Sequence, residues 1–270
     1  MVTGDKKDNI TYLNESKYII DNRKELIEKR KRKKYLIRIF FLSSVLLVIF
    51  LTLLFKLPYF SIKEVNVINN NNIKKEEIIR LSQIEKDTNI FKISLKNSSK
   101  KILTNPYVLE ADVKRKLPNK IIIDVKERKA AFYVISDSKY YIVDKNSVVL
   151  EKKDNINSMK LIRCVGVDEG NFELGQVLPF NDKAKAEAIK EVTELFLSTS
   201  NNIQMSILDV SKTYDIKAYY GNMCVKIGDS TDLKNKFNKA LSIMEIKNLN
   251  GKKGYIDVSF KGNPVFFIEN

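Results

Sequence analysis

The feature that most constrains this chain is an uncharged run of seventeen residues, Ile39 to Phe55, whose only polar members are two serines and a threonine. A hydrocarbon core about 30 Å thick needs roughly 20 helical residues at 1.5 Å each. The segment 35–57 reaches this length because the long side chains of Arg38 and Lys56 can extend to the headgroups. Pro58 should then end the helix. We therefore predict a transmembrane helix over residues 35–57 rather than the buried helix of a soluble core.

The charges that flank this run predict its orientation. The segment before it is strongly basic, whereas only Lys56 and Lys63 follow it before Glu64. The positive-inside rule therefore predicts a cytoplasmic N-terminus and an exported remainder. A cleaved signal peptide is less consistent, because the charged and apolar regions are too long and no small-x-small cleavage site follows. We expect residues 1–34 to be a flexible basic cytoplasmic tail whose last part lies on anionic headgroups through Arg30, Lys31, Arg32, Lys33, Lys34 and Arg38.

Composition narrows the classes of function. The formal net charge of +15 suggests nucleic-acid binding, but the densest basic run lies beside the predicted membrane span. Histidine is absent, which removes the commonest general base and metal ligand. The acidic pairs Glu76/Glu77 and Asp168/Glu169 could in principle perform glycosidase chemistry, but they fall in a predicted helical first turn and a loop, where solvated charges are common. We predict no enzyme activity, no cofactor and no metal site.

Two cysteines, Cys164 and Cys224, lie in predicted strands sixty residues apart. Their spacing allows one disulfide but cannot establish it. Two small buried apolar side chains are the simpler interpretation.

The segment after Pro58 contains short, clearly bounded elements. An alternating strand over 61–69 precedes two predicted helices, 74–84 and 94–105, the second with Ser94 as its N-cap. Two further strands, 108–117 and 120–128, are joined by a tight turn. The order strand, helix, helix, strand, strand predicts a small sheet with two helices on one face.

This order of elements, placed directly after a single anchor, resembles the POTRA domain of the bacterial cell-division proteins FtsQ and DivIB. The most specific part runs from Asn105 to Arg128. It contains a helix-ending Asn-Pro-Tyr-Val, a Leu117-Pro118-Asn119 turn and a strand that ends in Val-Lys-Glu-Arg. The family commonly has Gly-Asn after the first strand. Here Asn69 and Asn70 stand there instead, and asparagine tolerates the left-handed backbone conformation.

The rest of the chain resembles the β domain of the same family. Strand patterns at 131–135, 139–144 and 147–152 form a meander, and later strands meet at Gly221, where a hairpin turn needs a positive φ. Helical spacing predicts helices over 183–200 and 232–247. The chain then reaches the sequence Asp257-Val258-Ser259-Phe260, which matches the family's Asp-hydrophobe-x-aromatic signature.

We therefore predict an α+β protein in four parts. These are the tail (1–34), the transmembrane helix (35–57), a POTRA domain (58–129) and a mixed β domain with helices packed on its sheet (130–268). The resemblance implies a non-enzymatic, single-pass type II scaffold of the divisome, located in the cell membrane at the septum. It also implies the partners FtsL and FtsB or DivIC, which are small coiled-coil division proteins.

In this family the contact region follows the Asp-x-x-aromatic signature. The residues that the resemblance implies are Phe260, Lys261, Gly262, Asn263, Val265, Phe266, Phe267 and Ile268. Pro264 lacks an N–H, so a strand paired to this edge must begin after it or meet it where no donor is needed. Alternation predicts that one of Phe266 and Phe267 completes the core while the other faces a partner. Lys212 stands near the position where the family has a basic residue that pairs with an acidic partner residue.

Two alternatives stay open. The chain could itself be a membrane-anchored cell-wall hydrolase or synthase accessory with an activity of its own, which acids clustered in a cleft would indicate. It could also be a POTRA-type chaperone of a protein-translocation system, although such proteins tend to carry repeated POTRA units and a membrane barrel.

Overall fold

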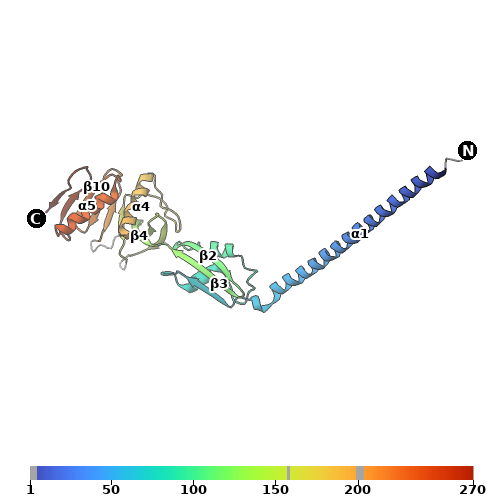
Figure 1. Cartoon of the computed structure of the whole chain (residues 1–270). Helices are drawn as coiled ribbons and strands as arrows, with labels where there is room; N and C mark the ends of the chain where they lie inside the picture. Colours follow the sequence, from blue (N-terminus) through green and yellow to red (C-terminus); the bar gives the residue numbers. More distant parts are fainter. Residues whose placement is uncertain (1–4, 157–158, 199–203, 270) are drawn as a thin grey trace. The chain divides into compact units, whose positions relative to one another are not determined.

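The computed structural model describes residues 5–156, 159–198 and 204–269. The chain divides into two compact units (Figure 1). The first contains the N-terminal helix and the chain after it up to Lys63, together with Lys86–Ile93 and Leu117–Asn119. The second contains Glu64–Glu85, Ser94–Lys116 and the chain from Lys120 onward.

Helix α1 spans Asp5–Lys56 and ends two residues before Pro58, as the sequence predicts. Its segment Asn22–Lys56 is the one helix, among the residues described, that is long and apolar enough to cross a membrane. The described part of the region before residue 35 continues the same helix. Many of its residues are good helix formers, and Glu25 and Lys29 form an i,i+4 ion pair at 2.6 Å.

A three-stranded sheet with two helices follows the short 3-10 helix η1 (Pro58–Phe60). Its elements are β1 (Glu64–Ile68), α2 (Lys75–Ser82), α3 (Leu95–Ile102), β2 (Val108–Lys116) and β3 (Lys120–Glu127). Strand β3 is central: it pairs in parallel with β1 and antiparallel with β2. The predicted order of strand, helix, helix, strand, strand is therefore confirmed.

Local chemistry explains where these elements begin and end. The side chain of Ser94 accepts a hydrogen bond from the N–H of Asn97 and caps α3. Asn69 has a φ of 62°, the left-handed conformation expected of the residue after the first strand. The Glu127 carboxylate accepts hydrogen bonds from the N–H groups of residues 71, 72 and 73, and these bonds fasten the turn after β1 to the end of β3.

The second sheet joins nine of the described strands in the order β12-β11-β10-β9-β8-β7-β4-β5-β6. In chain order these strands and the two helices of this region are β4 (Ala130–Ser136), β5 (Lys139–Asp144), β6 (Val149–Lys153), β7 (Ile162–Val165), α4 (Lys183–Ser198), β8 (Ile207–Asp209), β9 (Ile216–Tyr220), β10 (Met223–Gly228), α5 (Leu233–Ile246), β11 (Gly254–Asp257) and β12 (Val265–Ile268). Gly221, in the β9–β10 turn, has the predicted positive φ, 60°.

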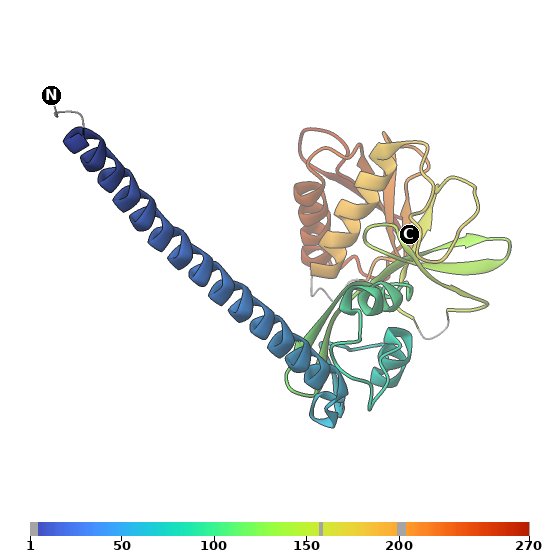
Figure 2. The same cartoon turned by 90° about the vertical axis from the view of Figure 1, so that its right-hand side faces the viewer.

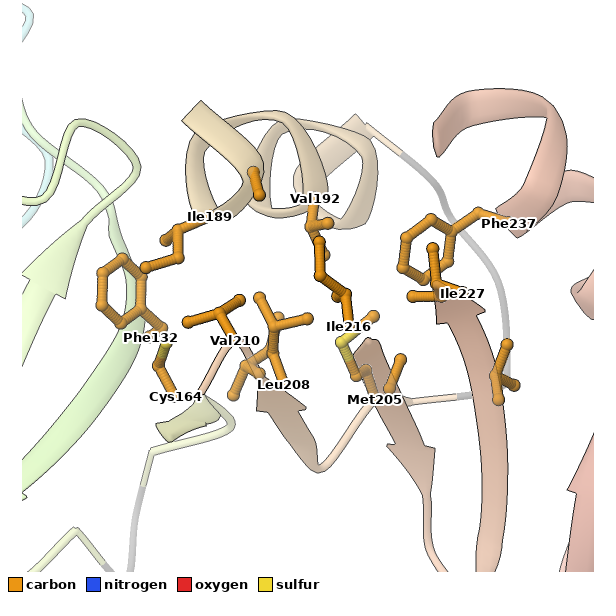
Figure 3. Close-up of a cluster of buried hydrophobic side chains, with 14 of the residues drawn as sticks. Phe132, Cys164, Ile189, Val192, Met205, Leu208, Val210, Ile216, Ile227 and Phe237 are labelled. Carbon is orange, nitrogen blue, oxygen red and sulfur yellow. The ribbon is translucent and has the colours of Figure 1, made fainter. Parts of the chain in front are cut away.

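Helices α4 and α5 lie side by side on one face of this sheet (Figure 2). Buried apolar side chains from both layers fill the space between them, including Phe132 on β4, Ile189 on α4 and Phe237 on α5 (Figure 3). The buried stripe of α5 consists of Leu233, Phe237, Ala240 and Met244, the residues that helical spacing predicts. Residues of β10 and β11 belong to this core, and β12 pairs with β11 at the edge of the sheet.

Cys164 and Cys224 are free thiols on β7 and β10. Strands β8 and β9 lie between them, so at about 4.8 Å per strand the cysteines are ~14 Å apart across the sheet. Disulfides need Cα atoms within about 7 Å. The order of the strands therefore excludes a disulfide between them, and the cysteines are two separate thiols, Cys164 buried and Cys224 partly buried.

Candidate functional site

Strand β12 is the edge of the nine-stranded sheet, and β11 is the one described strand that pairs with it. The N–H of Glu269 donates to the carbonyl of Lys253 at 2.9 Å, next to the register pair Gly254 and Ile268. Hydrogen-bonded and non-hydrogen-bonded pairs alternate in an antiparallel ladder. The backbone groups of Phe267 therefore point at β11, whereas those of Phe266 and Ile268 point outward from the free edge.

Gly254 allows β11 and β12 to approach this closely. A Cβ built on it would lie 2.0 Å from the carbonyl oxygen of Phe267, well inside van der Waals contact. Only glycine fits opposite that carbonyl without displacing the edge strand.

The side chains of β12 are more exposed than alternation predicts. Phe266 and Phe267 are 40% and 53% exposed, so the expectation that one of them completes the core is wrong. Ile268 packs against the core instead. Helix α5 packs over β10, two strands from this edge.

Two aromatic rings stack on the face of the sheet that is turned away from the helices. They belong to Tyr255 on β11 and Phe267 on β12, which are register partners of each other and of Cys224 on β10. The rings of Tyr255 and Phe267 stack with centroids 5.8 Å apart, and Lys226 Nζ lies 4.1 Å from the centroid of Tyr255. Sequence analysis missed Tyr255 and Lys226. The alternation in residues 254–257 could have indicated Tyr255, but the register that stacks it on Phe267 is tertiary.

The Asp257-to-Phe260 signature forms the turn that leaves β11. The Asp257 carboxylate accepts hydrogen bonds from the N–H of Ser259 at 3.0 Å and from its hydroxyl at 2.6 Å. Val258 is buried, and its N–H donates to the Lys226 carbonyl. Phe260 is consequently directed outward and is 49% exposed.

The segment 259–264 and helix α5 border two adjoining hollows of about 510 and 190 Å³. Four of the sequence-predicted residues line them: Phe260 and Lys261 line the smaller hollow, Asn263 lines the larger one, and Gly262 lines both. Lys236 lies 2.8 Å from Asp229 at the rim and, with hydrogen bonds from Thr231, lowers the pKa of the Asp229 carboxyl to about 2.

The structure brings all eight residues around the signature to one edge strand and the loop before it, and Ile268 packs that strand against the core. Lys212 lies elsewhere. It is exposed in the loop between β8 and β9, where its carbonyl accepts from the N–H of Asp215. Because β10 and β11 separate β9 from β12, at ~4.8 Å per strand Lys212 is not part of the edge surface.

One carboxylate of each pair that was considered for acid and base catalysis is hydrogen-bonded in the structure. Asp168 accepts from the N–H of Asn181 and pairs with Lys185 at 2.9 Å, and these contacts lower its pKa. A glycosidase acid needs a raised pKa. Glu77, in the first turn of α2, accepts from the Asn105 side chain. Within the described parts of the chain, no three His, Cys, Asp or Glu side chains gather to hold a metal ion.

Residues 60–128 match the family model described as POTRA domain, FtsQ-type. This match, the strand order β1-β3-β2 and the one helix of the described residues that is long and apolar enough to cross a membrane define a class: a POTRA-domain protein with one candidate membrane span.

Curated relatives then identify the family. The chain is 44% identical over 229 residues to the cell division protein DivIB of Clostridium tetani, which covers 84% of this chain and 86% of the relative. It is 42% identical over 221 residues to DivIB of Clostridium acetobutylicum, covering 82% and 88%. It is also 30% identical to the cell division protein FtsQ of Syntrophotalea carbinolica, covering 77% and 73%. The chain belongs to the DivIB/FtsQ family of cell division proteins.

Membership assigns the chain a role in bacterial cell division, in a family whose members are non-catalytic components of the divisome that interact with other division proteins. The candidate membrane helix agrees with a membrane protein. The free edge of β12 is the candidate surface for such interactions, because its outward N–H and C=O groups, exposed phenylalanines and adjoining hollows lie together.

Proposed function

We propose that this chain is a membrane-anchored scaffold whose β domain captures FtsL and FtsB or DivIC outside the membrane and so supports septum formation. The observation that carries the proposal is the free edge of β12, where Phe266 and Ile268 direct their backbone groups outward. An exposed sheet edge accepts a strand from another chain, and the alternate side chains give specificity.

The surface offers both affinity and selectivity. Val265 and Phe267 would face the partner on one side of the added strand, and Phe266 on the other. Burying a phenylalanine that is about half exposed contributes on the order of 1 kcal/mol at ~25 cal/mol per Å² of apolar area. Pro264 offers no N–H, so the added strand pairs with the edge from Phe266 onward. Lys261 and the rim lysines would favour an acidic partner segment.

The test measures binding of residues 59–270 to a co-expressed soluble FtsL and DivIC coiled-coil pair. Phe267→Ala and Ile268→Glu should weaken binding, with circular dichroism confirming that each variant stays folded. Ile135→Ala removes a side chain that is 43% exposed on β4 and serves as the matched control. Full binding by both folded edge variants would overturn the assigned surface.

A second comparison tests strand pairing itself. Phe266→Ala removes only the side chain, whereas Phe266→Pro also removes the N–H that points outward. Pairing of a partner strand requires the proline variant to bind more weakly than the alanine variant. Equal binding by the two variants would show that the partner contacts the side chains of β12 and does not pair with its backbone.

We also propose that the N-terminus lies in the cytoplasm, that the folded part after Pro58 is exported, and that the protein is located at the septum. A fluorescent fusion would test the location. The basic run Lys31 to Lys34 next to the span supports this orientation. Replacing these four residues by glutamine should disturb insertion in a protease-protection assay. Unchanged protection would contradict their role in orientation.

A further inference from the structure

The C-terminal end of the membrane helix is fastened to the loop 86–93. The Asn89 side chain donates from Nδ2 to the carbonyl of Leu54 at 2.8 Å and is only 8% exposed. Phe91 of the same loop lies edge-on to Phe55, with ring centroids 6.4 Å apart. The loop therefore stands level with the last residues of the uncharged run.

Backbone hydrogen bonds make this attachment continuous. The N–H of Ile62 donates to the Thr88 carbonyl, and the N–H of Ile90 donates to the Phe60 carbonyl, each at 2.9 Å. The N–H of Lys63 donates to the Asn119 carbonyl at 2.9 Å, which adds the turn 117–119. We call residues 57–63, 86–93 and 117–119 the collar. All of it belongs to the same compact unit as helix α1.

Helical geometry gives the depth of the collar. A hydrocarbon core of about 30 Å takes roughly 20 residues at 1.5 Å each, which the run ending at Phe55 nearly fills. The Leu54 carbonyl lies one residue before that end, so the amide bonded to it lies at the boundary between hydrocarbon and headgroups. A carbonyl at this depth needs a partner from the protein, and Asn89 supplies it.

The exposed side chains of the collar have the composition of a membrane interface. Leu57, Tyr59 and Leu117 are 43%, 64% and 59% exposed. The rings of Tyr59, Phe60 and Phe91 form a connected group, with neighbouring centroids 5.2 and 5.3 Å apart. Lys56, Lys86 and Lys92 are exposed around them. Aromatic rings with lysines beside them are favoured at the headgroup level of a bilayer.

We propose that the collar is a lipid-binding surface that lies in the headgroup layer, with Tyr59 and Leu117 in contact with the acyl-chain boundary. This inference rests on the proposed membrane anchoring and adds a second contact with the bilayer beyond the span. The collar ties the start of the POTRA-domain segment to the membrane surface instead of leaving it on a free linker.

The chain contains no tryptophan, so single tryptophan variants report on one position each. Leu117→Trp and Tyr59→Trp are placed in the full chain, which is reconstituted in phosphatidylcholine and phosphatidylglycerol vesicles. Lipids brominated near the carbonyl end or near the end of the acyl chain quench the emission by contact. Leu46→Trp, within the span, reports on the anchoring itself, and Tyr214→Trp is the comparison at a side chain that is 70% exposed before β9.

We expect blue-shifted emission at positions 59 and 117, with stronger quenching by the shallow bromine than by the deep one, and the reverse order at position 46. Quenching at position 46 without quenching at positions 59 and 117 would overturn the proposed lipid contact of the collar and leave the proposed membrane anchoring intact. No quenching at position 46 would overturn both. Equal quenching at positions 59, 117 and 214 would show adsorption of the whole surface and would also overturn the collar.

Discussion

Replacing Arg128 by alanine should lower the free energy of unfolding of the folded part after Pro58 by about 3–5 kcal/mol. Arg128 Nη1 lies 2.8 Å from Asp144 Oδ2, and the two side chains are 19% and 3% exposed. The other carboxylate oxygen accepts hydrogen bonds from the N–H groups of Asn146 and Val148. Without the guanidinium, Asp144 would keep a buried charge that has no cationic partner.

A nearby pair provides the control. Lys126 lies two residues earlier on β3, and its Nζ is 3.0 Å from Glu110, but these side chains are 63% and 66% exposed. Solvent-exposed pairs contribute about 0.2–1 kcal/mol. Lys126→Ala should therefore change stability by no more than that amount, although the two ion pairs have similar distances.

Pulse proteolysis in urea measures the fraction of unfolded chain for both variants. With a urea dependence near 2–3 kcal/mol per M, the Arg128 variant should shift the midpoint by roughly 1–2 M. Adding Asp144→Asn should recover part of the loss, because asparagine keeps the acceptor oxygen and removes the charge. A shift for Arg128→Ala as small as that for Lys126→Ala would refute the reasoning from burial.

Three further predictions concern the edge and the interior of the β domain. Gly254→Ala should displace β12 from β11, because its Cβ would meet the Phe267 carbonyl at 2.0 Å; the amide protons of residues 265–268 should then exchange faster, while unchanged exchange would contradict the close approach. The Asp229 carboxyl should titrate near pH 2 by NMR, and Lys236→Ala should raise that pKa toward 3.8. Since the folded pKa is depressed, the stabilisation is present above about pH 4 and is lost as the pH falls toward 2; an unaltered pKa in the variant would contradict the assigned cause. Cys164 should resist a maleimide in the native chain, because burial raises its pKa, whereas the partly exposed Cys224 should react first, and equal rates would contradict the burial.

Local patterns in the sequence were sufficient to predict most of the helices and strands. The uncharged run predicted the span, since its length and lack of charge admit few other structures. The POTRA-domain elements followed from alternation and helical spacing, with Ser94 and Asn69 at the positions that capping and a left-handed residue require. The stripe of α5 was predicted for the same reason, because helical periodicity is a property of the segment itself.

Features that depend on neighbours could not be read in this way. The N-terminal segment was predicted to be flexible, and its residues 5–34 continue α1; its flexibility stays a prediction. Phe266 and Phe267 alternate as a half-buried strand should, but both are exposed, because the burial of an edge strand depends on which elements pack over it in the tertiary structure. The division into four parts and the partner-binding residues stay predictions.

The sequence by itself determined most of the helices and strands, that one helix suits a membrane, and that the chain resembles a family of division proteins. Tertiary structure alone decided the order of strands, and with it the edge that lacks a partner, the separation of the two cysteines and the distance of Lys212 from β12. The reason is physical: periodicity and capping act over a few residues, whereas register and strand order are set by which faces bury one another across the whole sheet.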